Sequence, residues 1–227
     1  MPRYLFAGIL LSLWVGCHQQ PREVDGYLEA LFDQGLLNGN VLIARGDSIL
    51  YQRSFGFADP TEERPLTIFH HFAIGSIQKE FPAAAIMLLV EEGLVELEAP
   101  IAEYLPELPA WSRQVTIRHL LQYSSGLPEV DWEKWFGRSV PPDQETILDR
   151  LVHGPALLFP PGTDYSYTHY SPFLLQRIVE RITALPFPVF LEEEFFYPHG
   201  MEGISVMEHY PYRDTARMAL PSTSRGR

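Results

Sequence analysis

The sequence is poor in cysteine and in positive charge. Its only cysteine, Cys17, excludes a disulfide bond within the chain. Lys and Arg total 17 against 29 Asp and Glu, a net charge of -12, so the basic surface that binds nucleic acid is missing. Hydrophobic residues make up 46% and charged residues 20%, which is typical of a globular protein and not of a disordered chain. We therefore expect no nucleic-acid partner.

Long hydrophobic runs are also missing, apart from one near the N-terminus. Residues 4–16 are apolar except for Ser12. This run is shorter than the roughly 20 residues that span a membrane, and it fits the apolar part of a secretory signal. Val15-Gly16-Cys17 resembles the box at which bacterial lipoproteins are cleaved and lipidated. We predict a signal peptide and lipobox over residues 1–17, export to the periplasm or cell envelope, and a lipid anchor on Cys17; the alternative is a plain signal peptide or an uncleaved anchor.

The body of the chain changes character near residue 95. Before it, apolar spacing predicts a helix over residues 24–37 and a buried helix over 76–92, and two apolar segments joined by Gly46-Asp47 predict a hairpin. Beyond it, we predict short amphipathic helices around 116–122, 143–152, 172–182 and 188–196. The predicted organisation is a mixed α/β part over residues 18–95, a mostly helical part over 96–215 and an irregular tail over 216–227.

A serine and a lysine stand three residues apart at the start of the predicted buried helix. Positions i and i+3 share a helix face, so the Lys79 amine can reach the Ser76 hydroxyl. An amine removed from water binds its proton less tightly and can take the proton of a serine, which activates the nucleophile. The alternative is a serine that caps the helix beside a solvated lysine.

Residues 72–93, which include Ser76 and Lys79, resemble the first active-site box of the serine β-lactamase and penicillin-binding-protein family, particularly its class C and esterase-like branch. Further segments resemble that family in the same order, so the resemblance covers residues 24–215. It implies a β-lactamase/transpeptidase-like α/β fold, in which an antiparallel sheet with packed helices accompanies a mostly helical domain. It also implies hydrolysis of β-lactams, peptidoglycan peptides or small esters through an acyl-Ser76 intermediate, with no cofactor or metal.

The same resemblance implies roles for two tyrosines. In this family the tyrosine of a Tyr-x-Asn box approaches the nucleophile, and Tyr165-Ser166-Tyr167 follows the expected Pro-Gly turn. Tyr165 would share a proton with Lys79, first as general base and then as general acid. Tyr167 would bind substrate in place of asparagine, and because a phenol lacks the paired donor and acceptor of an amide, we expect altered recognition. The alternative is that these tyrosines belong to the aromatic core.

The third box of the family, Lys/His-x-Gly on a sheet strand, is missing, since none of the 16 glycines has Lys or His two places before it. In the family this strand supplies one N–H of the oxyanion hole, and losing one such donor typically costs ~10²- to 10³-fold in rate. The resemblance therefore implies an early end to the chain, an incomplete sheet and weak or absent activity. The alternative function is a catalytically inactive exported lipoprotein or binding domain derived from this family.

Two other kinds of site are disfavoured by spacing. No serine lies in the Gly-x-Ser-x-Gly frame of an α/β-hydrolase. The eight histidines do not form the His-Glu-x-x-His pattern of a zinc site. We therefore expect neither an α/β-hydrolase nor a metalloenzyme.

Overall fold

The computed structural model describes residues 22–59, 61, 63–130, 143–154, 157–206 and 217–220. The chain divides into two compact units, residues 1–70 with 219–227 and residues 71–218. We call them the N-terminal unit and the helical unit. The predicted signal segment with Cys17 and most of the predicted tail lie outside the described residues.

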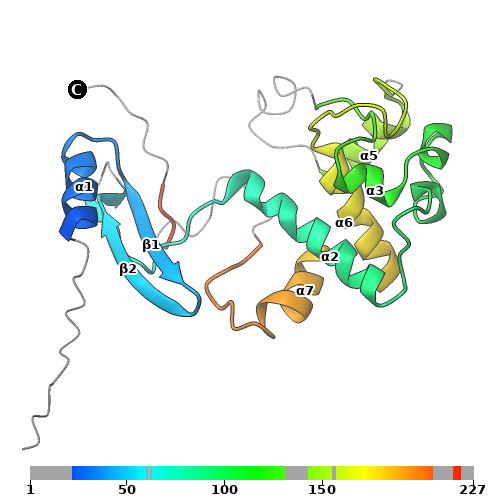
Figure 1. Cartoon of the computed structure of the whole chain (residues 1–227). Helices are drawn as coiled ribbons and strands as arrows, with labels where there is room; N and C mark the ends of the chain where they lie inside the picture. The colour runs from blue at the N-terminus through cyan, green and yellow to red at the C-terminus, as the bar shows by residue number, and fades with distance from the viewer. Residues whose placement is uncertain are drawn as a thin grey trace, which may run out of the picture. The chain divides into compact units, whose positions relative to one another are not determined.

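The N-terminal unit contains one helix and two small antiparallel sheets (Figure 1). Helix α1 (Arg22–Asp33) precedes strands β1 (Gly39–Arg45) and β2 (Ser48–Phe55), which pair in antiparallel fashion. Gly46 has φ +54° in the turn between them, a conformation that glycine adopts without strain. Strands β3 (Phe57–Asp59) and β4 (Arg64–Pro65) form the second pair. The predicted hairpin is therefore present.

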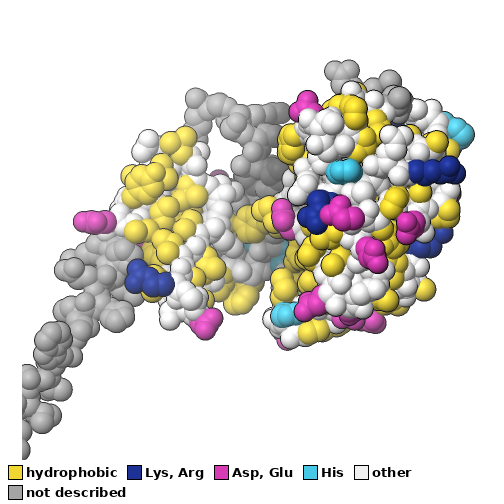
Figure 2. All heavy atoms as spheres, turned by 45° about the vertical axis from the view of Figure 1, so that its right-hand side comes forward, with side chains coloured by type: hydrophobic (Ala, Val, Ile, Leu, Met, Phe, Trp, Pro, Cys, Tyr) yellow, Lys and Arg dark blue, Asp and Glu magenta, His cyan; other side chains and the backbone are white. Residues whose placement is uncertain are grey.

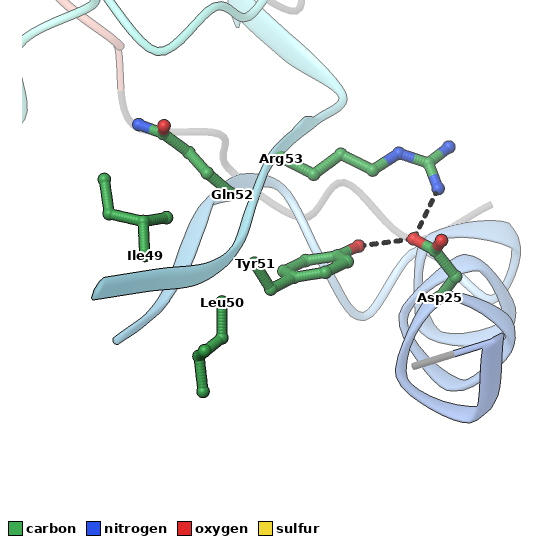
Figure 3. A pocket seen from close by; sticks show the side chains of 6 residues that line it. All are labelled: Asp25, Ile49, Leu50, Tyr51, Gln52 and Arg53. Carbon is green, nitrogen blue, oxygen red and sulfur yellow. Dashed lines mark hydrogen bonds and ion pairs between the residues drawn. The ribbon is translucent and has the colours of Figure 1, made fainter. Parts of the chain in front are cut away.

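A polar network ties α1 to β2 beside a shallow hollow of about 510 Å³ (Figure 3). The buried Tyr51 donates a hydrogen bond to Asp25 Oδ1 at 2.7 Å. Arg53 Nη1 donates to Asp25 Oδ1 at 3.0 Å and to Glu29 Oε1 at 2.8 Å. The hydrogen bonds from Tyr51 and Arg53 hold the pKa of the Asp25 carboxyl below its ordinary value. The network therefore fixes α1 against β2 within the N-terminal unit.

The hairpin leaves large apolar side chains on its surface. Leu42 is 59% exposed and Ile49 is 61% exposed, and Figure 2 shows hydrophobic side chains gathered on the N-terminal unit. Leu50 is also exposed, at 40%. No helix in the described part of the chain is both long and apolar enough to cross a membrane.

The helical unit is built around two packed helices. A 3₁₀ turn, η1 (Gly75–Lys79), leads directly into α2 (Glu80–Glu91), and α2 packs against α6 (Tyr170–Thr183). Helix α3 (Ile117–Leu121) also contacts α6. The core they share consists of fully buried aliphatic side chains, including those of Ile86, Leu89, Ile117, Leu120, Leu174 and Ile178.

Shorter elements complete this unit. They are the 3₁₀ turns η2 (Ile101–Glu103) and η3 (Ala110–Arg113), helix α5 (Gln144–Val152), helix α7 (Phe187–Leu191) and its π-helical continuation η4 (Glu192–Phe196). The side chain of Asp143 caps α5 by accepting a hydrogen bond from Thr146 N at 2.8 Å, which satisfies one N–H that a helix start leaves without an intrahelical partner.

The nucleophile helix differs from its prediction in two respects. Contacts divide the chain between His70 and His71, not near residue 95, because α2 packs on α6 and so belongs with the helices that follow it. The helix is also not buried all round: Ile86 and Leu89 are buried, whereas Met87 is 47% exposed. Its buried stripe faces the helical core, and the exposed side carries Met87 together with Glu80 and Glu91.

Candidate active site

Ser76 and Lys79 meet at the turn that starts α2. Gly75 has φ +52°, a left-handed conformation that favours glycine, and it opens the 3₁₀ turn η1 that carries both residues. Lys79 Nζ lies 2.8 Å from Ser76 Oγ, the proximity that the i, i+3 spacing predicts. Lys79 is only 9% exposed, whereas Ser76 is exposed. The amine is thus withdrawn from water while the hydroxyl remains reachable.

Tyr167 contacts both members of this pair. Lys79 Nζ lies 5.1 Å from the centre of the Tyr167 ring, and the phenol is hydrogen bonded to Lys79 and Ser76. Burial acts to raise the pKa of Tyr167, but these hydrogen bonds and the Lys79 charge outweigh it, so the pKa of Tyr167 lies below its ordinary value. A phenol that gives up its proton more readily suits proton transfer at the serine.

Tyr165, which we assigned to this place from the sequence, lies elsewhere. Its side chain is 63% exposed and its ring faces Tyr123, with centroids 6.2 Å apart. The structure brings Tyr167, and not Tyr165, to the Ser76–Lys79 pair, so the sequence-based assignment is two residues out of register. Thr168, which directly follows Tyr167, is fully buried.

His169 is a member of the site that sequence reasoning missed. Its Nε2 lies 2.9 Å from Lys79 Nζ, and its Nδ1 lies 3.0 Å from Glu129 Oε1. Burial lowers the pKa of His169; the hydrogen bond to Glu129 raises it and the Lys79 charge lowers it, with a net result below the ordinary value. The available signal was the spacing of Tyr167-Thr168-His169, which fits the Tyr-x-Asn pattern with histidine in the place of asparagine.

Tyr123 supports Tyr167 from the segment after α3. The two rings stack with centroids 5.1 Å apart and planes inclined by 22°. Tyr123 has φ +56°, an uncommon conformation for a residue other than glycine, and its carbonyl accepts a hydrogen bond from Ser166 N at 2.9 Å. Burial, with the nearby ionisable groups, raises the pKa of Tyr123 to about 12. Tyr123 therefore stays protonated and serves as a neutral support.

The arrangement contains the groups that acyl transfer to a serine requires. An exposed hydroxyl lies beside a buried amine and a phenol of lowered pKa, the combination of nucleophile and proton-transfer groups that covalent catalysis requires. No group of three or more His, Cys, Asp or Glu side chains that could hold a metal ion occurs among the residues that the structure describes.

Comparison with known proteins places this chain in a family. The chain belongs to the Beta-lactamase family, whose model matches residues 22–222. Penicillin-binding protein 4* of Bacillus subtilis (strain 168) is 34% identical over 204 residues, which are 84% of this chain and 45% of that protein. Esterase EstB of Burkholderia gladioli is 32% identical over 209 residues, 82% of this chain and 52% of the esterase. The chain thus spans about half the length of these curated relatives.

Solved structures agree with the family. D-amino acid amidase from Ochrobactrum anthropi SV3, complexed with L-phenylalanine, superposes with a TM-score of 0.75 at 27% identity, covering 86% of this chain and 54% of the amidase. The predicted family resemblance and the predicted β-lactamase/transpeptidase-like fold are both confirmed.

Proposed function

We propose that this protein transfers acyl groups to and from Ser76, as a serine hydrolase. The observation that carries the proposal is the 2.8 Å contact between the exposed Ser76 hydroxyl and the buried Lys79 amine. Lys79 in its neutral form accepts the hydroxyl proton while Oγ attacks the carbonyl carbon of the substrate. The ester so formed is the acyl-Ser76 intermediate, which water then hydrolyses.

Tyr167 takes the role that we first assigned to Tyr165. Its phenol is hydrogen bonded to both Lys79 and Ser76, so it can return a proton to the leaving nitrogen or oxygen as the tetrahedral intermediate collapses. With Tyr167 in this role, it no longer stands in for the substrate-binding asparagine, so its lack of an amide's paired donor and acceptor no longer bears on substrate recognition. Tyr165, which is 63% exposed, has no part in the proposed proton transfers.

The proposed substrates are small acyl donors, namely β-lactams, peptidoglycan-like peptides or small esters and amides. The relatives support this range, since their names include a penicillin-binding protein, an esterase and a D-amino acid amidase. Strained or activated donors should react best, because their leaving groups depart most easily. We therefore expect acylation of Ser76 by such donors.

Hydrolysis of a chromogenic cephalosporin and of a p-nitrophenyl ester by the full chain tests this function. Catalytic release of chromophore that disappears in Ser76→Ala supports a hydrolase. A single stoichiometric burst without turnover supports the alternative, a protein that binds acyl donors covalently but does not release them. Equal rates in the wild type and in Ser76→Ala would show that Ser76 is not the nucleophile.

We also propose that the protein is exported and held at a membrane surface through a lipid on Cys17. The apolar run over residues 4–16 and the small residue before Cys17 support this. Expression with and without Cys17→Ala, followed by membrane fractionation and intact mass measurement, tests it. A lipid-sized mass and membrane association that both vanish in the variant are expected; identical behaviour of the two proteins would contradict the anchor.

A further inference from the structure

The His169 ring lies between a carboxylate and the amine of the proposed site. Its Nδ1 is 3.0 Å from Glu129 Oε1 and its Nε2 is 2.9 Å from Lys79 Nζ. An ionised carboxylate only accepts hydrogen bonds, so the proton of the neutral ring resides on Nδ1 and the lone pair on Nε2. That lone pair faces Lys79.

Glu129 is itself held in place. Its Oε1 accepts a second hydrogen bond, from Val130 N at 2.7 Å. The side chains of His169 and Glu129 are 23% and 34% exposed, so water also reaches the contact between them. A continuous series of short contacts therefore joins the main chain at Val130 to Ser76 through Glu129, His169 and Lys79.

We propose that Glu129 and His169 are positioning residues that direct the Lys79 amine toward Ser76 and release it when His169 is protonated. This inference rests on the proposed acyl-transfer function. A neutral amine has two N–H groups and one lone pair. When one N–H is donated to His169 Nε2, the lone pair can turn toward the Ser76 hydroxyl, which is the geometry that proton acceptance requires.

Protonation of His169 reverses this arrangement. The ring then carries an N–H on Nε2, so a donor and a positive charge face the amine. Among the described residues, the titratable groups facing the ring include Lys79 from η1, Glu129 from the segment after α3, and Tyr167, whose ring lies edge-on at 5.6 Å. Because burial holds the pKa of His169 below its ordinary value, the contact with Lys79 is made at neutral pH and lost in acid.

The tautomer and titration of His169 can be measured without any enzymatic activity. Imidazole ¹⁵N spectra of the full chain, assigned with His169→Asn, should show a neutral ring protonated on Nδ1. Lys79→Met should raise the titration midpoint of His169, because the N–H that Lys79 donates to Nε2 is removed and that lone pair becomes free to take a proton, and Glu129→Gln should lower it, because an opposite charge is removed. A ring protonated on Nε2, or a midpoint that neither substitution moves, would overturn the inference.

The second measurement is the pH dependence of Ser76 acylation by a p-nitrophenyl ester. In the wild type the rate should show a decline of about tenfold per pH unit that begins at the His169 midpoint. His169→Asn offers an amide oxygen to Lys79 at every pH, so the decline tied to that midpoint should be absent; in Glu129→Gln it should move to lower pH. An acid decline unchanged in both variants would overturn the inference. If the wild type is never acylated but the spectra are as expected, the proposed function fails and the positioning contact stands.

Discussion

Thr168 Oγ1 donates a hydrogen bond of 2.6 Å to the carbonyl oxygen of Pro128. Thr168 is fully buried, and its hydroxyl also accepts a hydrogen bond from Tyr170 N at 3.1 Å. The residues on either side of it, Tyr167 and His169, both contact Lys79. One buried threonine therefore sets the register in which this segment meets the nucleophile.

Thr168→Val should destabilise the helical unit and slow acylation together. Valine keeps the shape but removes the hydroxyl that bonds the Pro128 carbonyl and the Tyr170 N–H, which costs about 1–3 kcal/mol of unfolding free energy. Thr163→Val is the matched control, since Thr163 Oγ1 also donates to a proline carbonyl, that of Pro160 at 2.7 Å, but at an exposed place. Urea unfolding of both variants provides the comparison; equal losses of unfolding free energy in the two variants would contradict this role for Thr168.

Tyr167→Phe and Tyr165→Phe test which tyrosine of Tyr165-Ser166-Tyr167 takes part in the acylation of Ser76. Removing the Tyr167 hydroxyl should lower the rate of Ser76 acylation by about 10²-fold or more, the usual worth of a positioned proton-transfer group. Removing the hydroxyl of the exposed Tyr165 should leave the rate almost unchanged. Stopped-flow acylation with a chromogenic ester measures both. A large loss in Tyr165→Phe with none in Tyr167→Phe would restore the sequence-based assignment.

Gly126→Ala should destabilise the segment that carries Glu129. Gly126 has φ +80°, and a Cβ there would collide with the carbonyl oxygen of Phe159. A residue other than glycine in such a conformation costs about 1–3 kcal/mol, and the collision adds to this. Gly203→Ala is the control, because Gly203 has open space around it. Thermal unfolding should show a lowered midpoint for Gly126→Ala alone; similar midpoints for the two variants would argue against a tight turn here.

His169 should make the stability of the helical unit depend on pH. Burial lowers its folded-state pKa below the unfolded value, so the unfolded chain binds more protons in the interval between the two. This contribution is complete above the unfolded pKa and is lost as pH falls through the folded pKa. The difference in unfolding free energy between wild type and His169→Asn should therefore favour the wild type more at about pH 8 than at about pH 5. A difference independent of pH would contradict the buried, neutral ring.

Much of the fold was predictable because its signals are local. The i, i+3 spacing of Ser76 and Lys79 and the turn at Gly46 require only neighbouring residues, and both features are present in the structure. The unit boundary was not predictable in the same way. It depends on α2 packing against α6. The apolar spacing within either helix shows which face is buried but does not show which other helix packs on that face.

The rest of the site depends on tertiary contacts. Lys79 and His169 are 90 residues apart in the chain, and Glu129 reaches His169 from a third segment. Tyr165-Ser166-Tyr167 offers two tyrosines that each fit near a Pro-Gly turn, and pattern alone does not choose between them. Burial of Thr168 makes the choice, and burial of one polar threonine has no signature in the sequence.

Covalent labelling of the full chain tests the central claim, that Lys79 activates Ser76 for acylation. The protein is incubated with a reactive β-lactam, its intact mass is measured and the modified peptide is mapped. We predict one adduct, on Ser76, that is absent in Ser76→Ala and strongly reduced in Lys79→Met. An adduct on another residue, or equal labelling of Ser76 in the wild type and in Lys79→Met, would contradict the account.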